Sequence, residues 1–286
     1  MRLGIWTAYY LYPNLSLEDV LRRLSGFGWK DVELSTEHVV ELLQDADGQK
    51  RLNRVRAFLE KEGIKAGQLH TKIDLNVAHP DPNRRAQEVD TALRCLDIAH
   101  ALDIPCAVIH PGGAQGYSSG KAREEIVRLN VQAFEKLCER AEKLGVRVCV
   151  ENMGGTGEGG KRILGGYIFE LQEVIDRVGS EALGICFDTS HANLMKLDLP
   201  EEIRACGDRL VATHISDNDG SGDQHRMPFC GNIDWIAVIG ALKEIGYGGL
   251  FNLEIPGERC RSIEVQDAKL HYIKGVLEPM LINIEH

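Results

Sequence analysis

The 286-residue sequence lacks the long apolar runs that cross membranes. A membrane helix needs about 18 to 20 consecutive apolar residues, and no stretch of this chain approaches that length. The sequence also opens without a secretory signal, because Met1-Arg2-Leu3 leads directly into a segment with the pattern of a strand. We therefore expect a protein without a membrane partner, located in the cytoplasm.

Paired cysteines and an excess of positive charge are missing as well. The eight cysteines form no C-x-x-C pair, and Cys106, Cys149 and Cys186 lie inside apolar runs. Thiols in such runs behave as small hydrophobic side chains, which is consistent with a reducing compartment. The formal net charge of −10 argues against a broad surface for polyanions. Nucleic acid is therefore not expected as a partner.

The sequence does contain short apolar runs that alternate with helical patterns. Strands are predicted at residues 3–7, 31–34, 64–70, 106–110, 147–151, 183–188, 210–215 and 250–255. Helices are predicted at residues 17–27, 50–62, 83–102, 122–144, 169–178, 201–206, 233–245 and 263–281. Eight such units with short connections predict an α/β protein with one domain over residues 1–286, a single (β/α)8 TIM barrel.

Six of the apolar runs end on a residue type that binds metals. These strand-end residues are His70, His110, Glu151, Asp188, His214 and Glu254. The carboxyl ends of the strands of a parallel barrel form one rim, where active sites are built. The sequence therefore predicts that the active site lies at the C-terminal rim of the strands.

Four of these residues predict a metal site. Glu151, Asp188, His214 and Glu254 end strands five to eight and supply three carboxylates and one imidazole. Three carboxylates lie so close together only when a cation neutralises them or one is protonated. The oxygen-rich set suits Mn²⁺, Mg²⁺ or Co²⁺, and the imidazole also allows Zn²⁺. No organic cofactor is expected.

A second group consists of His70, His110, His191, Asp223 and His225. The spacings Asp188-x-x-His191 and Asp223-x-His225 can bring two groups to one metal. Two interpretations stay open, since these side chains would either bind additional metal ions or hold substrate hydroxyls and orient the metal ligands.

Two loops depart from the compact pattern. Residues 154–162 after the fifth strand are rich in glycine, but their spacing fits neither G-x-G-x-x-G nor a P-loop, so a mobile lid is expected. Residues 216–232 after the seventh strand are rich in polar side chains and include Asp223, His225 and Arg226. We expect this second loop to contribute to function.

With these motifs the chain resembles the xylose isomerase-like barrel superfamily, which includes sugar phosphate isomerases/epimerases, ketose 3-epimerases, inosose dehydratases and endonuclease IV. The motifs that carry the resemblance are Val108-Ile109-His110-Pro111-Gly112, Val150-Glu151-Asn152, Phe187-Asp188-Thr189-Ser190-His191-Ala192, His214-Ile215-Ser216-Asp217-Asn218-Asp219-Gly220 and Gly231-Asn232-Ile233-Asp234-Trp235. The resemblance implies that Glu151, Asp188, His214 and Glu254 hold one metal in the manner of the ketose 3-epimerases. It also allows, as an alternative, that these four and the second group hold three zinc ions, as in endonuclease IV.

The sequence departs from the family at two places. The family commonly has a Pro-Gly-x-Gly turn where this chain has Pro228-Phe229-Cys230-Gly231, which puts a bulky side chain near the mouth. The segment after His70, residues 71–76, has no aromatic side chain that could pry a damaged nucleotide out of DNA. Both departures bear on the substrate rather than on the metal site.

The leading prediction is a metal-dependent sugar isomerase/epimerase that acts on a small sugar, keto-sugar or polyol derivative by proton transfer through a cis-enediolate. Glu151 and Glu254 would be the catalytic residues, while Trp6, His191 and Arg226 would bind substrate. The alternatives are an endonuclease IV-like three-zinc phosphodiesterase acting on abasic-site DNA, an inosose dehydratase-like lyase, and a non-catalytic subunit. Assembly into a homo-oligomer is left open.

Overall fold

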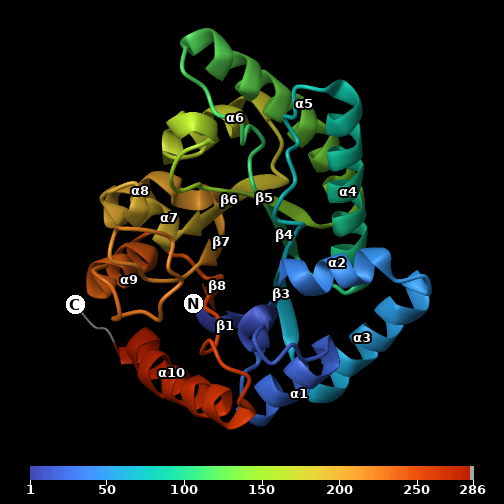
Figure 1. The fold of residues 1–286 in the computed structure, drawn as a ribbon, viewed down its shortest axis with the longest axis vertical. Helices are drawn as coiled ribbons and strands as arrows, with labels where there is room; N and C mark the ends of the chain where they lie inside the picture. Colours follow the sequence, from blue (N-terminus) through green and yellow to red (C-terminus); the bar gives the residue numbers. More distant parts are fainter. Residues whose placement is uncertain (284–286) are drawn as a thin grey trace.

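The structure, a computed structural model, describes residues 1–283. Its centre is one sheet of eight parallel strands in the order β7-β6-β5-β4-β3-β2-β1-β8. The strands are β1 (Arg2–Trp6), β2 (Asp31–Leu34), β3 (Lys65–His70), β4 (Cys106–Ile109), β5 (Arg147–Glu151), β6 (Leu183–Asp188), β7 (Leu210–His214) and β8 (Leu250–Leu253). A bridge between Ile215 and Leu253 joins β7 to β8. The predicted (β/α)8 TIM barrel is therefore confirmed (Figure 1).

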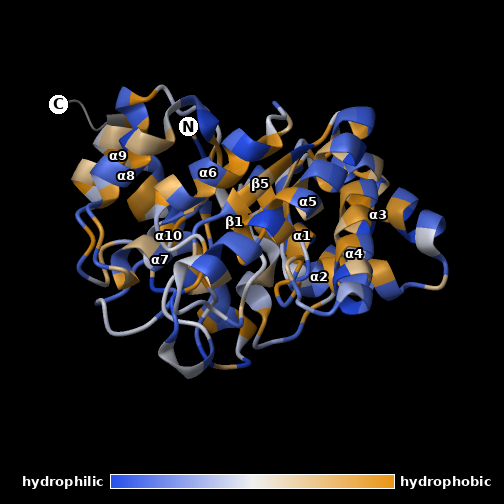
Figure 2. Ribbon diagram, turned by 90° about the horizontal axis from the view of Figure 1, so that it is seen from above, coloured by the Kyte–Doolittle hydropathy of each residue, from blue (hydrophilic) through white to orange (hydrophobic). Residues whose placement is uncertain are grey.

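Helices surround this ring of strands. They are α1 (Leu17–Gly26), α2 (Thr36–Gln44), α3 (Gly48–Glu62), α4 (Pro82–Ala101), α5 (Gly120–Leu144), α6 (Ile168–Val178), α7 (Thr189–Leu194), α8 (Leu199–Cys206), α9 (Trp235–Glu244) and α10 (Ile263–Asn283). Short 3-10 helices lie at Thr7–Tyr10, Glu158–Gly160 and Gly207–Arg209. Figure 2 shows hydrophobic residues concentrated on the central strands and hydrophilic residues on outward helix faces.

The sequence patterns did not predict two of the helices, α2 and α7. Helix α7 has six residues and begins directly after Asp188, whose carboxylate accepts a hydrogen bond from the His191 backbone N–H. A helix of fewer than two turns carries too few residues to show the 3.6-residue period. It was therefore hidden in the motif around Asp188.

Local chemistry explains where most helices begin and end. Ser16 caps α1 by accepting a hydrogen bond from the Asp19 backbone N–H, and Asp81 caps α4 in the same way. Gly63 and Gly145 end α3 and α5 with φ angles of 63° and 67°. Glycine adopts this left-handed conformation at low cost, so it ends the helix and directs the chain into the next strand.

Inside the barrel, an apolar cluster lies below the strand ends. Buried Cys106, Val108, Cys149, Cys186 and Ala212 form this cluster. Since side chains alternate along a strand, residues two positions before a strand-end residue share its face. Burial raises the pKa of the Cys149 and Cys186 thiols well above the ordinary value, which keeps them protonated and unreactive.

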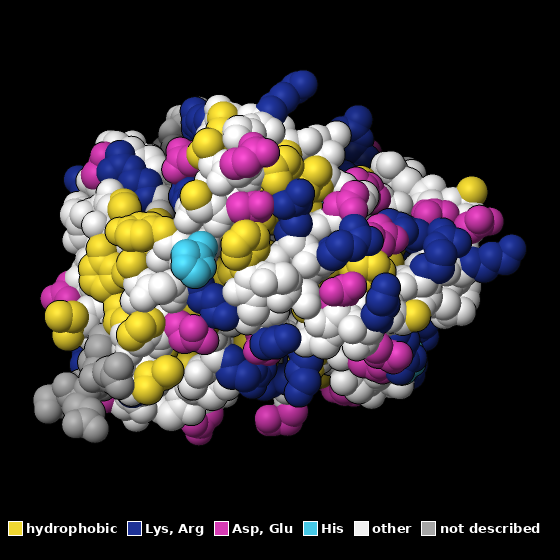
Figure 3. Space-filling view, turned by 90° about the horizontal axis from the view of Figure 1, so that it is seen from below, with side chains coloured by type: hydrophobic (Ala, Val, Ile, Leu, Met, Phe, Trp, Pro, Cys, Tyr) yellow, Lys and Arg dark blue, Asp and Glu magenta, His cyan; other side chains and the backbone are white. Residues whose placement is uncertain are grey.

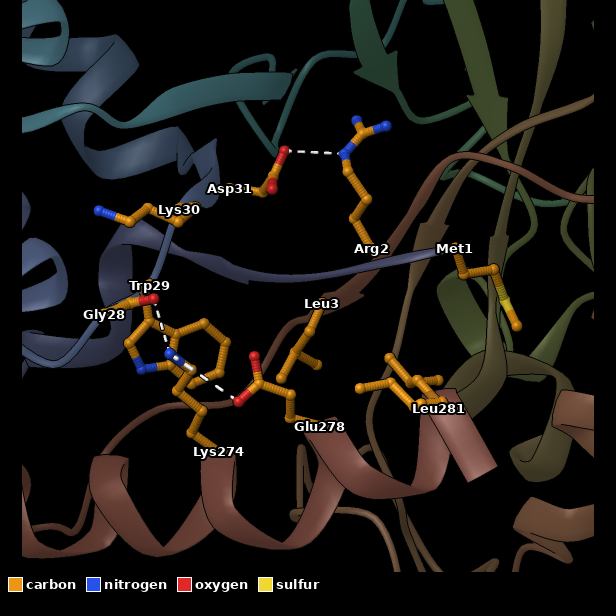
Figure 4. Close-up of a pocket in the computed structure, with 11 residues that line it drawn as sticks. Met1, Arg2, Leu3, Gly28, Trp29, Lys30, Asp31, Lys274, Glu278 and Leu281 are labelled. Carbon is orange, nitrogen blue, oxygen red and sulfur yellow. Dashed lines mark hydrogen bonds and ion pairs between the residues drawn. The ribbon is translucent and has the colours of Figure 1, made fainter. Parts of the chain in front are cut away.

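Helix α10 packs against β1 at the other end of the barrel, where it lines a cavity of about 260 Å³ (Figure 4). Lys274 of α10 donates hydrogen bonds to the carbonyls of Gly28, at 2.6 Å, and Phe27, at 3.4 Å. Arg2 pairs with Asp31 at 3.0 Å. Lys274 and Arg2 thus both have partners at this end of the barrel.

The molecular surface and the helix lengths bear on the expected partners. Figure 3 shows Lys, Arg, Asp and Glu side chains interspersed over one face, without a continuous field of one sign. Within residues 1–283, no helix is both long enough and apolar enough to span a bilayer.

Candidate metal centre

The rim brings the four predicted ligands together. Glu151, Asp188 and His214 are the last residues of β5, β6 and β7, and Glu254 directly follows β8. Their ligand atoms all lie within 4.8 Å of one another. All four residues are buried, and the most exposed of them, Glu254, is 5% exposed. Strand register explains this convergence, because β6 and β7 pair Asp188 with His214 directly.

Several polar atoms of this cluster are buried without a hydrogen-bond partner among the described residues. They include Glu151 Oε2, Asp188 Oδ2 and His214 Nδ1. Leaving such an atom unsatisfied costs roughly 1 to 3 kcal/mol, and native structures contain few of them. Three carboxylates and one imidazole form a donor set suited to a divalent cation, so the residues present fit a metal.

His214 is held in one orientation by Glu33. The Nε2 atom of His214 lies 2.9 Å from Glu33 Oε2, while its Nδ1 lies 3.1 Å from Glu151 Oε1 and 3.3 Å from Glu254 Oε2. An imidazole that donates one N–H to a carboxylate presents the other nitrogen as a ligand. Glu33 thus directs Nδ1 of His214 towards the other carboxylates.

The sequence patterns gave Glu33 no role. It lies in β2, across the barrel from β7, and is fully buried. Gln68 of β3 donates a hydrogen bond to Glu33 and another, at 3.2 Å, to the Thr213 carbonyl. The position of Glu33 near a strand end was the available signal, but no motif surrounds it.

The electrostatics of the cluster show competition between charges. Burial raises the pKa of Glu254 to about 7, and the carboxylates of Glu151 and Asp188 add to this effect. Burial alone would raise the pKa of Glu151, but His214, His110 and His191 together hold it well below the ordinary value. Without a cation, protons on these side chains offset the negative charge. A metal would therefore have to displace a proton from Glu254.

The second group extends the cluster in two directions. The Nε2 atoms of His70 and His110 each lie 3.4 Å from Glu151 Oε2 and have no hydrogen-bond partner among the described residues. On the other side, Asp223 Oδ2 lies 3.6 Å from His191 Nε2 and 3.0 Å from His225 Nε2. The four predicted metal ligands and the five residues of the second group thus belong to one continuous arrangement.

Three of these histidines share one anchoring pattern. Nδ1 of His70, His191 and His225 each lies 2.8 Å from a backbone carbonyl oxygen, that of Thr71, Asn152 and Glu254 respectively. An Nδ1–H that donates to a carbonyl fixes the tautomer and leaves Nε2 as the free nitrogen. The geometry accommodates both interpretations of the second group, as metal ligands or as substrate contacts.

Neighbouring polar residues hold the strand ends in register. Asn152 accepts a hydrogen bond from the Asp188 backbone N–H at 2.7 Å and donates to the Asp188 carbonyl at 3.0 Å. Ser190 donates to Asp223 at 2.6 Å, and Asn218 donates to Ser190. These contacts explain the polar residues next to the ligands in the motifs.

The loop at residues 216–232 folds around buried Asp217. Its carboxylate accepts hydrogen bonds from the Gly231 backbone N–H and the Trp235 indole N–H, both at 2.9 Å. A side chain at Gly231 would collide with Asp217, so this turn requires glycine. Phe229 lies in the turn whose sequence differs from the Pro-Gly-x-Gly of the family. It is 52% exposed and has a φ of 72°. The loop is thus a built part of the rim.

The three predicted substrate contacts occupy different environments. Trp6 donates its indole N–H to the Ile255 carbonyl at 2.7 Å. Its ring stacks on that of His225, with 5.9 Å between the ring centroids. His191 lies within the cluster. Arg226 instead contacts Asp219 at 2.9 Å and the Cys230 carbonyl at 3.2 Å. The structure places Trp6 and His191 beside the proposed ligands, whereas Arg226 contacts the outer part of its own loop.

Arg162 ties the end of the glycine-rich loop to the barrel. The Tyr117 backbone N–H donates to the Arg162 carbonyl at 2.8 Å, and the guanidinium lies over the rings of Tyr117 and Tyr167. Residues 154–161 lie between this anchor and β5. Their action as a lid stays a prediction.

Curated relatives include proteins of several kinds. The chain is 32% identical over 183 residues to the uncharacterized protein MJ1311 of Methanocaldococcus jannaschii, a match over 63% of this chain and 61% of that relative. It is 34% identical over 139 residues to a probable endonuclease 4 of Natranaerobius thermophilus, covering 47% and 46%. It is 24% identical over 273 residues to D-psicose 3-epimerase of Enterocloster bolteae, covering 89% and 82%. The first two matches thus span less than two thirds of those relatives.

Solved structures and a family model agree with the fold. A D-tagatose 3-epimerase-like protein superposes with a TM-score of 0.79 at 23% identity, covering 99% of this chain and 98% of the other. The IOLI protein with a bound zinc atom gives a TM-score of 0.79 at 19% identity, with the same coverage. Residues 21–276 match the xylose isomerase-like TIM barrel model. The chain therefore belongs to the xylose isomerase-like TIM barrel family.

Proposed function

We propose that this protein is a metal-dependent isomerase or epimerase that acts by proton transfer on a small sugar, keto-sugar or polyol derivative. The observation that carries the proposal is the convergence of Glu151 and Glu254 on the Nδ1 atom of His214, at one buried point of the rim. Similarity to D-psicose 3-epimerase along most of the chain supports it.

In this proposal Glu151, Asp188, His214 and Glu254 hold the metal. A divalent cation there would polarise the substrate carbonyl and stabilise negative charge that develops on its oxygen. Glu151 and Glu254 would remove and return a proton at the carbon next to that carbonyl. Burial excludes water that would otherwise compete for the proton.

The face on which the proton returns decides the product. Removal of the proton by one of Glu151 and Glu254 and its return by the other on the opposite face of a cis-enediolate would invert the carbon centre. Return to the adjacent carbon would interconvert aldose and ketose, and loss of hydroxide would give dehydration. Trp6 supplies an apolar wall beside His225 for the substrate.

The test is solvent-deuterium incorporation into a panel of ketoses by metal-loaded protein, with chelated protein as control. We expect deuterium at the carbon next to the carbonyl in the loaded sample and none in the chelated one. Absence of exchange from every sugar with metal fully loaded would contradict the proposal.

A second candidate is an endonuclease IV-like three-zinc phosphodiesterase. The observation that favours it is the free Nε2 atoms of His70 and His110 on one side of the cluster and the His191-Asp223-His225 group on the other. Similarity to a probable endonuclease 4 over about half the chain supports it. About three zinc equivalents per chain and cleavage of an abasic-site duplex would establish this activity instead.

A cytoplasmic location and assembly into a homo-oligomer stay predictions. Sedimentation of the metal-loaded protein would give the oligomeric state directly.

A further inference from the structure

A groove lies beside the rim, between the loops that follow β7 and β8. It has a volume of about 490 Å³ and is lined by residues 224–227 and Cys230 on one side and residues 256–259 on the other. Lys269 and Tyr272 of α10 form its outer wall. His225 lines the groove and also contacts Asp223 and the Glu254 carbonyl, so the groove adjoins the proposed metal centre.

The charge of this groove differs from that of the chain. Arg226, Arg259 and Lys269 line it together with a single carboxylate, Glu258. The protein as a whole carries a formal net charge of −10. For comparison, a groove at the opposite end of the barrel is lined by three basic and three acidic side chains.

The cations of the groove are not all neutralised. Lys269 lies 3.0 Å from Glu258 Oε1, and Arg226 lies 2.9 Å from Asp219 Oδ2. Arg259 has no ion-pair or hydrogen-bond partner within residues 1–283. Its guanidinium is therefore available for an anion, with five N–H donors in a fork that matches phosphate or carboxylate oxygens.

The segment that carries Arg259 is held rigidly. Fully buried Gln266 accepts a hydrogen bond from the Glu258 backbone N–H at 2.7 Å and donates to the carbonyls of Glu258 and Cys260, at 2.8 and 2.9 Å. The Gly257 backbone N–H donates to the Tyr9 carbonyl at 2.8 Å. Arg259 thus extends from a turn fixed on both sides, which lowers the entropy cost of binding.

We infer that this groove binds an anionic substituent of the substrate, a phosphate or a carboxylate, while the reacting carbons of the sugar lie at the rim. Loops after strands seven and eight are the place where TIM barrels frequently bind phosphate. The inference rests on the proposed function, because it names the class of sugar that the same site turns over. Arg259 is the principal contact, and Lys269, which also contacts Glu258 and the Pro256 carbonyl, contributes a second positive charge.

The experiment uses metal-loaded protein and matched pairs of substrates, a neutral ketose with its phosphate ester and a neutral ketose with its keto-sugar acid. We expect KM for one anionic partner to be at least about tenfold lower than for the neutral sugar, as for one charge-assisted hydrogen bond. Arg259→Gln and Lys269→Gln should each remove most of that preference. Arg261→Gln is the matched control, because exposed Arg261 lies two residues further on and does not line the groove.

Calorimetry with inorganic phosphate separates this inference from the proposed function. We expect the Arg259→Gln/Lys269→Gln double variant to bind phosphate at least about tenfold more weakly than wild type and Arg261→Gln. Loss of phosphate binding in the double variant, with no sugar turned over by wild type, would leave the groove as an anion site and overturn the proposed function. Turnover with equal KM for neutral and anionic sugars, or unchanged phosphate binding in the double variant, would overturn the groove inference.

Discussion

The two ends of the barrel differ in which kinds of polar atom are buried without a hydrogen-bond partner. At the rim, Glu151, Asp188 and His214 are buried with polar atoms that lack partners within the described chain. At the other end, Lys274 contacts backbone carbonyls and Arg2 contacts Asp31 (Figure 4), and the buried atoms there without a partner in the described chain are the indole Nε1 of Trp29 and the Nε of Arg147. Within residues 1–283, only the rim gathers unpartnered carboxylate and imidazole atoms within 4.8 Å of one another, which supports the proposal that the rim holds a cation.

The largest effect should come from removing a proton-transfer group at the rim. Glu151→Gln and Glu254→Gln should each lower kcat at least about a hundredfold, because general acid-base catalysis contributes roughly 10² to 10⁴. Thermal unfolding should show that both variants remain folded, since glutamine keeps the shape of the side chain. Glu60→Gln, an exposed carboxylate on α3, is the matched control and should retain wild-type kcat. Wild-type turnover by both rim variants would refute the assigned roles.

Metal removal should lower the free energy of unfolding. A cation bound only by the folded state at a hundred times its Kd adds about 2.7 kcal/mol to the free energy of unfolding, which chelation removes. The pKa of Glu254 is raised to about 7, so this carboxyl is protonated below pH 7 and the metal must displace that proton. Metal affinity should therefore fall as the pH drops from 8 to 6. An unfolding temperature that is insensitive to both chelator and metal would contradict this expectation.

Glu33→Gln tests whether the contact with His214 contributes to metal affinity at the rim. Residues that orient a metal ligand typically contribute about 10- to 100-fold to metal affinity, and Glu33 lies 2.9 Å from His214 Nε2. We expect a loss of that size in competition with a fluorescent chelator. Metal at high concentration should restore much of the kcat, which a misfolded protein would not show. Unchanged affinity would mean that Glu33 does not orient His214.

The smallest effect is expected at the opposite end. Lys274→Met removes the hydrogen bond to the Gly28 carbonyl and should lower the free energy of unfolding by about 1 kcal/mol. Metal affinity and KM should match those of wild type, because the change lies away from the rim. A loss of metal affinity comparable to that of Glu33→Gln would break the distinction between the two ends.

The strands and the gathering of their end residues at one rim could be predicted because both depend on local pattern. An apolar run that ends on Glu151 or Asp188 is a buried parallel strand in any such barrel, and closing the barrel brings those ends to one rim. The role of Glu33 could not be predicted, since its contact with His214 crosses the barrel between β2 and β7. The groove depends on hydrogen bonds from Gln266 of α10 to the loop that precedes α10. A periodic sequence pattern does not predict such contacts.

The sequence also could not predict which nitrogen of His214 faces which carboxylate. Sequence places an imidazole at the end of β7, but only packing determines that Nε2 meets Glu33 and Nδ1 meets Glu151 and Glu254. Side-chain orientation follows from contacts between distant segments rather than from the residues beside it.

The most direct test of the account is the metal content of tag-free, unchelated protein by elemental mass spectrometry, repeated on Asp188→Asn. The account predicts about one equivalent of Mn, Co, Mg or Zn per chain in wild type and a marked loss in the variant. A wild-type protein that holds no divalent metal and takes none up on dialysis would contradict the claim that the unpartnered atoms of the rim form a metal centre.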